Sequence, residues 1–424
     1  MSTLNFSTSS TRLLAIGARC PAAMQQRSTW SLKEFSLVSE VGSGAASVVW
    51  YAVCRRSLCP VALKMYHKKL LSPLNSHQVE REVLIHSTLA HPHIVDFYAA
   101  FEDEERVYLV LEYAAGGDLF DNVKRLGGRL SEQQVVHAVM YPYLSALAYL
   151  HARGVVHRDL KPENTVFQVR TSSTGVQEKV LKITDFGLAI NIRQERPVTR
   201  LGTLDFMSPE VLRCPDKLHP SDNKDRPDLA YGPACDVWAV GALAYELCVG
   251  RAPFGMSSRE ATMQAITSLQ PGLPEWISPA AADFICASLT KDPAARASLD
   301  SLLFHPWVMP AAAAAAAAAA TSCTSTCTPQ SATGATTAAA AKQAVMAQYG
   351  LGQGRSQGLA SWGSRSGHLV TAATQPLKVP GSSHPSKLRT STAPLAPGAA
   401  RQGQRGRQAG GVLLQGPCNS IYRT

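Results

Sequence analysis

His157-Arg158-Asp159-Leu160-Lys161-Pro162-Glu163-Asn164 is the stretch that decides the fold of this chain. It follows an apolar run and places a carboxylate, a lysine and an amide in one short loop. A second acid stands in Asp185-Phe186-Gly187, directly after the strand-like run 180–184. Carboxylate and amide oxygens suit Mg²⁺, whereas a lysine offsets phosphate charge. The two motifs therefore indicate a site for a metal-bound phosphate.

A glycine-containing loop and a lysine lie upstream of these motifs. Gly42 and Gly44 stand between two strand-like runs, and glycine lets the backbone approach a phosphate closely enough for its N–H groups to donate. Lys64 lies in an apolar strand, where a buried ammonium needs a partner such as Glu82 on the following helix. Taken alone, Lys64 would equally suit a solvated strand position. Together, these groups are what phosphoryl transfer from Mg-ATP requires.

The residues around the motifs predict two lobes of different character. Short β-branched runs predict strands at 36–38, 47–53, 61–65, 94–101 and 107–112, with one helix at 78–89. After Gly116-Gly117, long apolar faces predict helices such as 132–151 and 236–249. The polar segments 168–180 and 214–233 are expected to be solvated loops.

With these motifs in place, the sequence resembles the eukaryotic protein kinases over about residues 33–308. The resemblance implies an α+β, bilobal protein kinase fold with a small β-rich N-lobe (33–112), one helix in that lobe, and a larger, mainly helical C-lobe (116–308). It also implies ATP as substrate, Mg²⁺ as cofactor and proteins as phosphate acceptors.

The resemblance assigns roles position by position. Asp159 would be the catalytic base, Lys161 would steady the γ-phosphate, and Lys64, held by Glu82, would contact the α- and β-phosphates. Asn164 and Asp185 would hold Mg²⁺. The other ATP contacts that it implies are Val41, Gly42, Gly44, Val49, Ala62, Glu112, Ala114 and Val166. Ser47 replaces the third glycine of the family's loop, which weakens the cradling of phosphate.

Further positions concern the acceptor and its control. Lys161 resembles the Ser/Thr-specific branch, and Thr203 lies in the substrate-side loop. Arg158 predicts activation by a phosphate, with Thr199 as the candidate site. Three acids match positions at which basophilic kinases bind arginine, which predicts basic residues near the target Ser or Thr. These acids are Asp118, Glu163 and Glu246.

Within the family, residues 202–210 and 109–114 most resemble the Aurora kinases. His86 stands where most kinases have an aliphatic residue, and this polar gap favours an activating protein partner. The calcium/calmodulin-dependent kinases are the alternative, because Ser47 fits that group as well. A pseudokinase scaffold is the competitor from another class, and the presence of every charged group that the reaction needs argues against it.

The ends of the chain differ from its centre in composition. Ten of the 41 Lys and Arg residues lie in 309–424, which contains no Asp or Glu, so this tail holds the whole net charge of +10. It is expected to be disordered, basic and of low complexity, because few large apolar residues offset the ordering entropy. Binding of the tail to nucleic acid, microtubules or acidic lipid is the alternative, but the charges are dilute.

Residues 1–32 are expected to be a disordered extension or a transit peptide, because the first 30 contain arginines but no acids. The protein is accordingly expected in the cytoplasm or nucleus, or in the chloroplast or mitochondrion if a transit peptide is present. No apolar run reaches the roughly 20 residues of a membrane span. Cys323 and Cys327 lack the further ligands of a zinc site.

Overall fold

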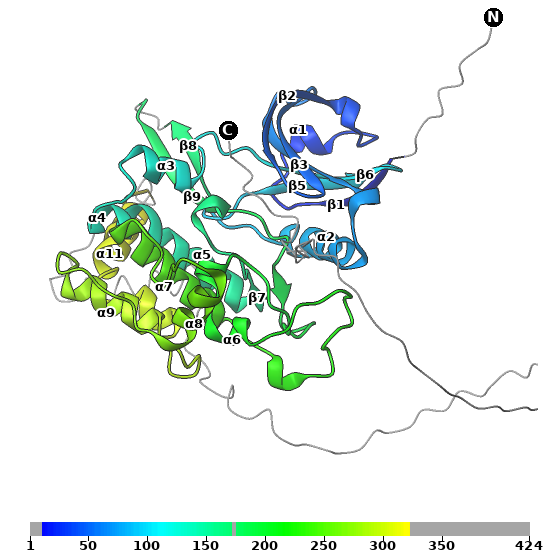
Figure 1. The fold of residues 1–424 in the computed structure, drawn as a ribbon. Coiled ribbons are helices and arrows are strands. Elements are labelled where there is room, and N and C mark those ends of the chain that lie inside the picture. The colour runs from blue at the N-terminus through cyan, green and yellow to red at the C-terminus, as the bar shows by residue number, and fades with distance from the viewer. Residues whose placement is uncertain (1–10, 172–174, 323–424) are drawn as a thin grey trace, which may run out of the picture. The chain divides into compact units, whose positions relative to one another are not determined.

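The computed structural model describes residues 11–171 and 175–322, which all lie in one compact unit. A small lobe built on one sheet and a larger helical lobe confirm the expected α+β kinase architecture (Figure 1). The strands are β1 (Arg12–Ile16), β2 (Phe35–Ser43), β3 (Ser47–Cys54), β4 (Pro60–His67), β5 (Phe97–Glu102), β6 (Arg106–Glu112), β7 (Val155–Val156), β8 (Thr165–Thr171), β9 (Gln177–Ile183) and β10 (Ile190–Asn191). The helices are α1 (Ala22–Gln25), α2 (Pro73–His86), α3 (Leu119–Arg125), α4 (Glu132–Gln134), α5 (Tyr141–Ala152), α6 (Pro209–Leu212), α7 (Ala234–Val249), α8 (Arg259–Ser268), α9 (Pro279–Ser288), α10 (Leu299–Leu303) and α11 (Met309–Ser322).

The small lobe contains an antiparallel sheet in the order β1-β5-β6-β4-β3-β2. Side chains alternate along a strand, and β4 is buried on both faces. Its residues Val61, Leu63 and Met65 belong to one apolar cluster, whereas Ala62 and Tyr66 belong to another that includes residues of α2. The apolar run of β4 therefore requires a cover on each side of the sheet.

Residues 11–32 supply part of that cover. β1 pairs with the edge of β5, so that Arg12 lies opposite Glu102. Met24 and Trp30 are buried in the same apolar cluster as Leu63 of β4. The expectation of disorder is therefore wrong for residues 11–32, because β1 pairs with β5 and side chains such as Met24 pack on the sheet, whereas the transit peptide stays a prediction. Residues 1–10 lie outside the described residues.

The helix α2 begins earlier than its apolar pattern predicts. Ser72 caps it by accepting a hydrogen bond from the backbone N–H of Asn75 at 3.2 Å, and Pro73 occupies the first turn. Proline suits this position because its missing N–H would have no partner there. The helix ends at His86 rather than Leu89.

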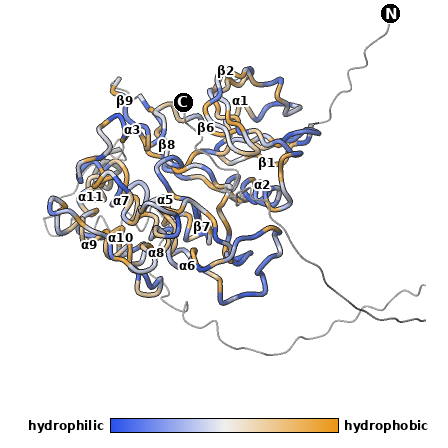
Figure 2. Tube along the Cα trace, viewed as in Figure 1, coloured by the Kyte–Doolittle hydropathy of each residue, from blue (hydrophilic) through white to orange (hydrophobic). Residues whose placement is uncertain are grey.

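The large lobe is built around α5 and α7, whose residues are apolar on most sides and almost all buried. Figure 2 shows the hydrophobic colouring of these helices. Helix α11 continues the lobe beyond residue 308, and Ala311 and Ala312 are buried. The expectation of disorder from residue 309 onward is therefore wrong for α11. The rest of the tail, with Cys323 and Cys327, lies outside the described residues.

The loop between α6 and α7 differs from the solvated loop that its polarity suggests. Residues 214–233 are mostly hydrophilic (Figure 2), yet Cys214, Lys217 and Tyr231 are buried. The expectation of full solvation is thus wrong for these three side chains. Residues 168–171 and 177–180, in contrast, pair in the antiparallel ladder of β8 and β9.

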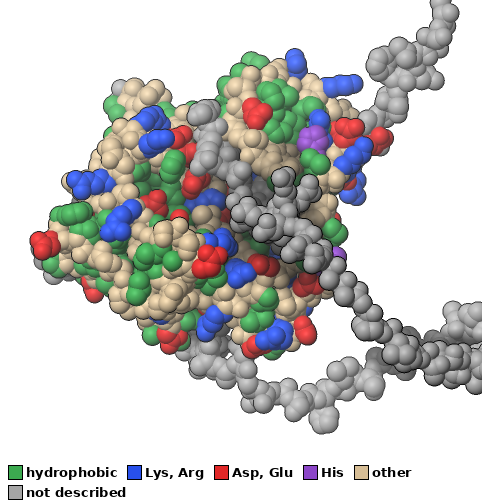
Figure 3. All heavy atoms as spheres, viewed as in Figure 1, with side chains coloured by type: hydrophobic (Ala, Val, Ile, Leu, Met, Phe, Trp, Pro, Cys, Tyr) green, Lys and Arg blue, Asp and Glu red, His purple; other side chains and the backbone are tan. Residues whose placement is uncertain are grey.

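Surface charge and helix length bear on possible partners. On the face drawn in Figure 3, acidic and basic side chains of the described residues are interspersed. Among the described helices, none combines the length and apolar character needed to cross a membrane.

Candidate functional site

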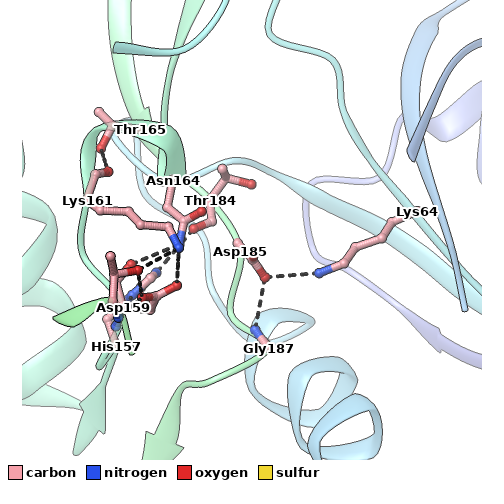
Figure 4. A network of polar contacts seen from close by, with 10 residues as sticks. Lys64, His157, Asp159, Lys161, Asn164, Thr165, Thr184, Asp185 and Gly187 are labelled. Atoms are coloured by element: carbon pink, nitrogen blue, oxygen red, sulfur yellow. Dashed lines mark hydrogen bonds and ion pairs between the residues drawn. The ribbon is translucent and has the colours of Figure 1, made fainter. Parts of the chain in front are cut away.

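Lys64 of β4 lies at the centre of a buried network between the two lobes. Its Nζ is 3.0 Å from Asp185 Oδ1 (Figure 4). The same Nζ is 2.9 Å from Glu82 Oε1 on α2. Tyr66 donates a hydrogen bond to Glu82 Oε2 at 2.6 Å. Burial raises the pKa of Glu82, while the charge of Lys64 and these hydrogen bonds oppose that rise. The structure thus joins the predicted lysine–glutamate pair, with Tyr66 as an added partner.

Asp159 lies in a second network within the large lobe. Its Oδ2 is 2.8 Å from Lys161 Nζ and accepts a hydrogen bond from Asn164 Nδ2 at 2.9 Å. Its Oδ1 accepts hydrogen bonds from the backbone N–H and the hydroxyl of Thr203, each at 3.1 Å. Lys161 also donates to Thr203 Oγ1 at 3.0 Å. The arrangement holds one carboxylate in a fixed orientation at the loop that the sequence singled out.

Asp236 of α7 holds the backbone of this loop. It accepts hydrogen bonds from the N–H groups of His157 and Arg158, both at 2.9 Å, and lies 2.8 Å from His151 Nε2. Burial would raise the pKa of Asp236, but these donors lower it. Arg158 has a φ of 71°, a left-handed conformation that costs free energy in a non-glycine residue. The Asp236 contacts offset that cost.

A row of rings links the two networks. Phe186 contacts His157 and His86, with ring centroids 5.0 and 4.5 Å away, and His86 contacts Phe97 at 5.4 Å. His86 is fully buried, and its Nε2 lies 2.7 Å from the carbonyl oxygen of Val95. Burial lowers the pKa of His86 to about 4, so the ring is neutral near pH 7. The polar residue therefore leaves no gap in the row, although its Nδ1 has no hydrogen-bond partner.

The apolar residues assigned to ATP come together in the small lobe. Val41, Val49, Ala62, Ala114 and Val166 belong to one buried cluster. Gly42 lies opposite Val49 in the β2–β3 hairpin, and Gly44 donates its N–H to Ser47 O at 2.7 Å. Val166 comes from β8, so the cluster contains residues from both sides of the segment that joins the lobes.

Asn164 and Asp185 fit a magnesium ion. The Nδ2 of Asn164 donates to the Asp159 backbone carbonyl and carboxylate, whereas its Oδ1 is buried without a hydrogen-bond partner. A buried carbonyl oxygen with no donor suits a hard cation, and Mg²⁺ in phosphate sites takes few protein ligands. The described residues contain no cluster of three His, Cys, Asp or Glu side chains that would suit another metal.

The three acids assigned to the substrate have different environments. Asp118 is fully buried and caps α3 by accepting the N–H of Asp121 at 2.7 Å, so it exposes no oxygen to a substrate, and the expectation for this residue is wrong. Glu163 and Glu246 are partly exposed. Burial raises the pKa of Glu246 to about 7, helped by the charges of Glu163 and Asp205. Asp205 thus joins this acidic group, and the sequence reasoning missed it.

Thr199 and Arg158 lie in one pocket of the large lobe, which α2 also lines. Arg158 donates to the carbonyl oxygen of Leu188 at 2.6 Å and to Tyr231 Oη at 3.2 Å. Thr199 is buried, and its carbonyl oxygen accepts a hydrogen bond from Tyr231 at 3.0 Å. The structure therefore brings the two predicted regulatory residues together.

One further buried ion pair escaped the sequence reasoning. Lys182 of β9 is fully buried, 2.7 Å from Glu112 Oε2, and donates to Ile94 O at 3.1 Å. The resemblance assigns Glu112 to ATP, and its side chain also joins the two lobes. The sequence did contain a signal for this ion pair, because a lysine within the apolar run 180–184 needs a buried partner. The same signal predicted the partner of Lys64.

Comparisons with known proteins agree with this geometry. A family model described as "Protein kinase domain" matches residues 35–308. An "Aurora kinase" of Patiria pectinifera is 34% identical over 286 residues, which cover 67% of this chain and 65% of that protein. An "Aurora kinase" of Schizosaccharomyces pombe is 33% identical over 277 residues, covering 65% and 71%. "Aurora kinase B" of Danio rerio is 34% identical over 279 residues, covering 66% and 80%. These matches do not favour the calcium/calmodulin-dependent alternative.

Proposed function

The chain belongs to the protein kinase family, with a Ser/Thr kinase domain like those of the Aurora kinases, and from this premise we propose that the whole protein phosphorylates protein serine and threonine. The family implies ATP as phosphate donor and Mg²⁺ as cofactor. The observation that carries the proposal is the simultaneous presence of two networks, one joining Lys64, Glu82 and Asp185, the other joining Asp159, Lys161 and Thr203.

Each network has a task in the transfer. Lys64, oriented by Glu82, binds the α- and β-phosphates of ATP. Asp159 orients the acceptor hydroxyl and receives its proton, while Lys161 offsets the charge of the phosphoryl group in flight. Burial would lower the pKa of Lys161, but Asp159 raises it, so the lysine stays charged.

Asn164 and Asp185 would hold the magnesium ion. When bound, Mg²⁺ neutralises phosphate charge and orients the phosphates for in-line attack. Asp159 then acts on the acceptor side of the reaction. Its carboxylate faces the substrate-side loop, where it accepts a hydrogen bond from the Thr203 hydroxyl.

Autophosphorylation and transfer to a generic Ser/Thr protein substrate in Mg-ATP test the proposal. The wild-type protein should transfer phosphate, and Asp159→Asn should lose activity by about 10²- to 10⁴-fold, the usual contribution of a general base. A wild-type protein that binds ATP but transfers no phosphate would instead support the pseudokinase scaffold.

We further propose that the substrates carry basic residues near the acceptor. Glu163, Asp205 and Glu246 support this proposal, because the like charges around Glu246 would be relieved by an arginine. A peptide array should show enrichment for Arg or Lys, and Glu246→Gln should reduce it. An array with no basic preference in the wild type would contradict the proposal.

An activating protein partner and the compartment also remain proposals. The partner is supported by His86, whose buried Nδ1 lacks a hydrogen bond and weakens the position of α2. His86→Leu should therefore raise the basal activity. A cytoplasmic or nuclear location is supported by the burial of residues such as Trp30, which cleavage after residue 30 would remove from the fold. Imaging of a C-terminal fluorescent fusion tests the location.

A further inference from the structure

The carboxylate of Glu195 lies between basic side chains of helix α2 and of loop 214–233 and pairs with both. It lies 3.1 Å from Arg81 Nη1 on α2, 2.5 Å from Lys224 Nζ in loop 214–233, and 3.5 Å from His77 Nε2. Burial would raise the pKa of Glu195, but the hydrogen bond from Lys224 and the neighbouring positive charges lower it to about 2. The carboxylate is therefore fully charged at neutral pH.

Loop 214–233 also contacts the segment around Thr199 at other points. Asp216 accepts two hydrogen bonds from Arg200, at 3.2 and 2.6 Å. The N–H of Tyr231 donates to Pro197 O at 3.1 Å, and its hydroxyl donates to Thr199 O at 3.0 Å. The loop thus fixes residues 195–200 from several sides, although its polar composition suggested a solvated segment.

Arg81 connects this arrangement to the catalytic lysine. It precedes Glu82 in α2, and neighbouring residues of a helix point about 100° apart. Arg81 therefore extends to Glu195 while Glu82 extends to Lys64. Holding Arg81 in place also sets the rotation of α2 that brings Glu82 within reach of Lys64.

The pocket beside Thr199 has an excess of positive charge. Arg81, Arg158 and Lys217 line it, and Glu195 is its one acidic lining residue among the described residues. Arg158 forms no ion pair in the described part of the chain, and its buried Nη2 has no hydrogen-bond partner. Burial lowers the pKa of Lys217 to about 8, helped by the positive charge of Lys224. Glu195 therefore already supplies negative charge to this pocket. A phosphate on Thr199 would add further negative charge to the same pocket.

We propose that Glu195 and Lys224 are positioning residues that hold α2 in its active place before Thr199 is phosphorylated. Glu195 bridges Arg81 and the 214–233 loop, and through Arg81 it keeps the Lys64–Glu82 pair formed. A phosphate on Thr199 supplies a second, overlapping source of negative charge for Arg81, Arg158 and Lys217. This inference rests on the proposed kinase activity, and it predicts that the unphosphorylated protein already has basal activity.

The test compares full-length proteins with Thr199 unphosphorylated, as verified by mass spectrometry, and measures kcat and the KM for ATP. Glu195→Gln and Lys224→Gln should each lower kcat/KM by about tenfold, a typical coupling effect. The KM for ATP should rise, because Lys64 loses its orientation. Glu195→Asp should retain part of the activity. Asp228→Asn is the matched control, because Asp228 pairs with Arg226 within the same loop and both side chains are exposed.

Phosphorylation of Thr199 separates positioning from mere stability. The phosphate should restore Glu195→Gln toward the wild-type rate, whereas a variant that is only misfolded would not recover. Wild-type kinetics in unphosphorylated Glu195→Gln, or a loss that phosphate does not restore, would overturn the inference. A wild type that is active only when phosphorylated would overturn it too, while leaving the proposed function standing. A wild type inactive in both states would contradict the proposed function itself.

Discussion

The carboxylate of Asp159 accepts hydrogen bonds from Lys161, Asn164 and Thr203, which fix its orientation. The motif predicted its loop, its lysine and its amide, and the structure places both Lys161 and Asn164 within hydrogen-bond reach of the Asp159 carboxylate. The contact with Thr203 could be inferred only from family resemblance, because 44 residues of sequence separate the two. Distant contacts of this kind depend on how the substrate-side loop folds back, which local pattern does not encode.

Thr203 offers a test of that contact. Its hydroxyl donates to Asp159 Oδ1 and accepts from Lys161 Nζ, so it fixes both groups. Thr203→Val should lower kcat by about 10- to 100-fold, because it leaves two charged groups with a missing partner. Thr203→Ser keeps the hydroxyl and should remain active. Steady-state kinetics with equal rates for the valine and serine variants would contradict this role.

Two buried histidines make stability depend on pH. Burial lowers the pKa of His86 to about 4 and that of His91 to about 3, from 6.5 in the unfolded chain. As the pH falls, the two histidines bind protons in the unfolded state before they do so in the folded state. Their contribution to the free energy of unfolding is therefore complete above about pH 6.5 and is lost as the pH falls toward 4. Each histidine should cost about 1.4 kcal/mol per pH unit in that window.

Urea unfolding at pH 7 and pH 5.5 measures this effect. The two histidines together should contribute a fall of roughly 2–3 kcal/mol in the free energy of unfolding over that interval. This contribution is obtained by comparing variants, because Glu246, whose pKa is raised to about 7, responds in the opposite sense. His86→Leu should remove about half of the fall. His137→Gln, which changes an exposed side chain, is the control and should leave the fall unchanged. An equal pH response in wild type and His86→Leu would refute the assignment.

Strands and helices that carry their own apolar pattern lie where their sequence predicts them. Strands β3, β4 and β6 and helix α7 lie close to their expected places, and α4 and α5 together occupy much of the helix expected at 132–151. The sequence reasoning failed for β1, whose five residues gain their structure from pairing with β5. The sequence contained one signal for residues 11–32, the apolar run of β4. Such a run indicates that both faces of the sheet are buried, so a further segment must cover the second face.

Trp30 tests whether residues 11–32 stabilise the small lobe. It is buried beside Phe101, with ring centroids 6.2 Å apart, and the Arg27 guanidinium lies 4.2 Å above its ring. Trp30→Ala should reduce the free energy of unfolding by about 3–5 kcal/mol, the usual cost of truncating a large buried aromatic. Trp276→Ala is the control, because Trp276 is 63% exposed. Chemical denaturation measures both variants. Similar losses of unfolding free energy in Trp30→Ala and Trp276→Ala would argue against a stabilising role of residues 11–32.

At the scale of the whole molecule, the lobes are joined by more than the connecting segment. Val95 N donates to Ile183 O and Ile183 N donates to His93 O, both at 2.9 Å, and Lys182 pairs with Glu112. Composition and motifs predicted two lobes but not these contacts, because each joins residues far apart in the sequence. The same limit explains why the buried side of loop 214–233 was missed.

The extent of the folded unit can be tested directly. A fragment of residues 11–322 contains β1, α1 and α11, whereas the fragment 33–308 suggested by sequence lacks all three. The shorter fragment should melt several degrees lower and aggregate more readily, because it exposes the β5 edge and an apolar sheet face. Thermal denaturation and light scattering compare the two. Equal melting temperatures would show that the additional elements contribute little.

Strand β1 also has a consequence for synthesis. Arg12 leaves the ribosome 90 residues before its partner Glu102. At 5–20 residues per second, β1 waits roughly 5–20 s for β5 to emerge. Trp30 likewise waits for Phe101 of β5, the ring beside which it is buried. The pace of translation between β1 and β5 therefore sets how long molecular chaperones have to bind this apolar segment.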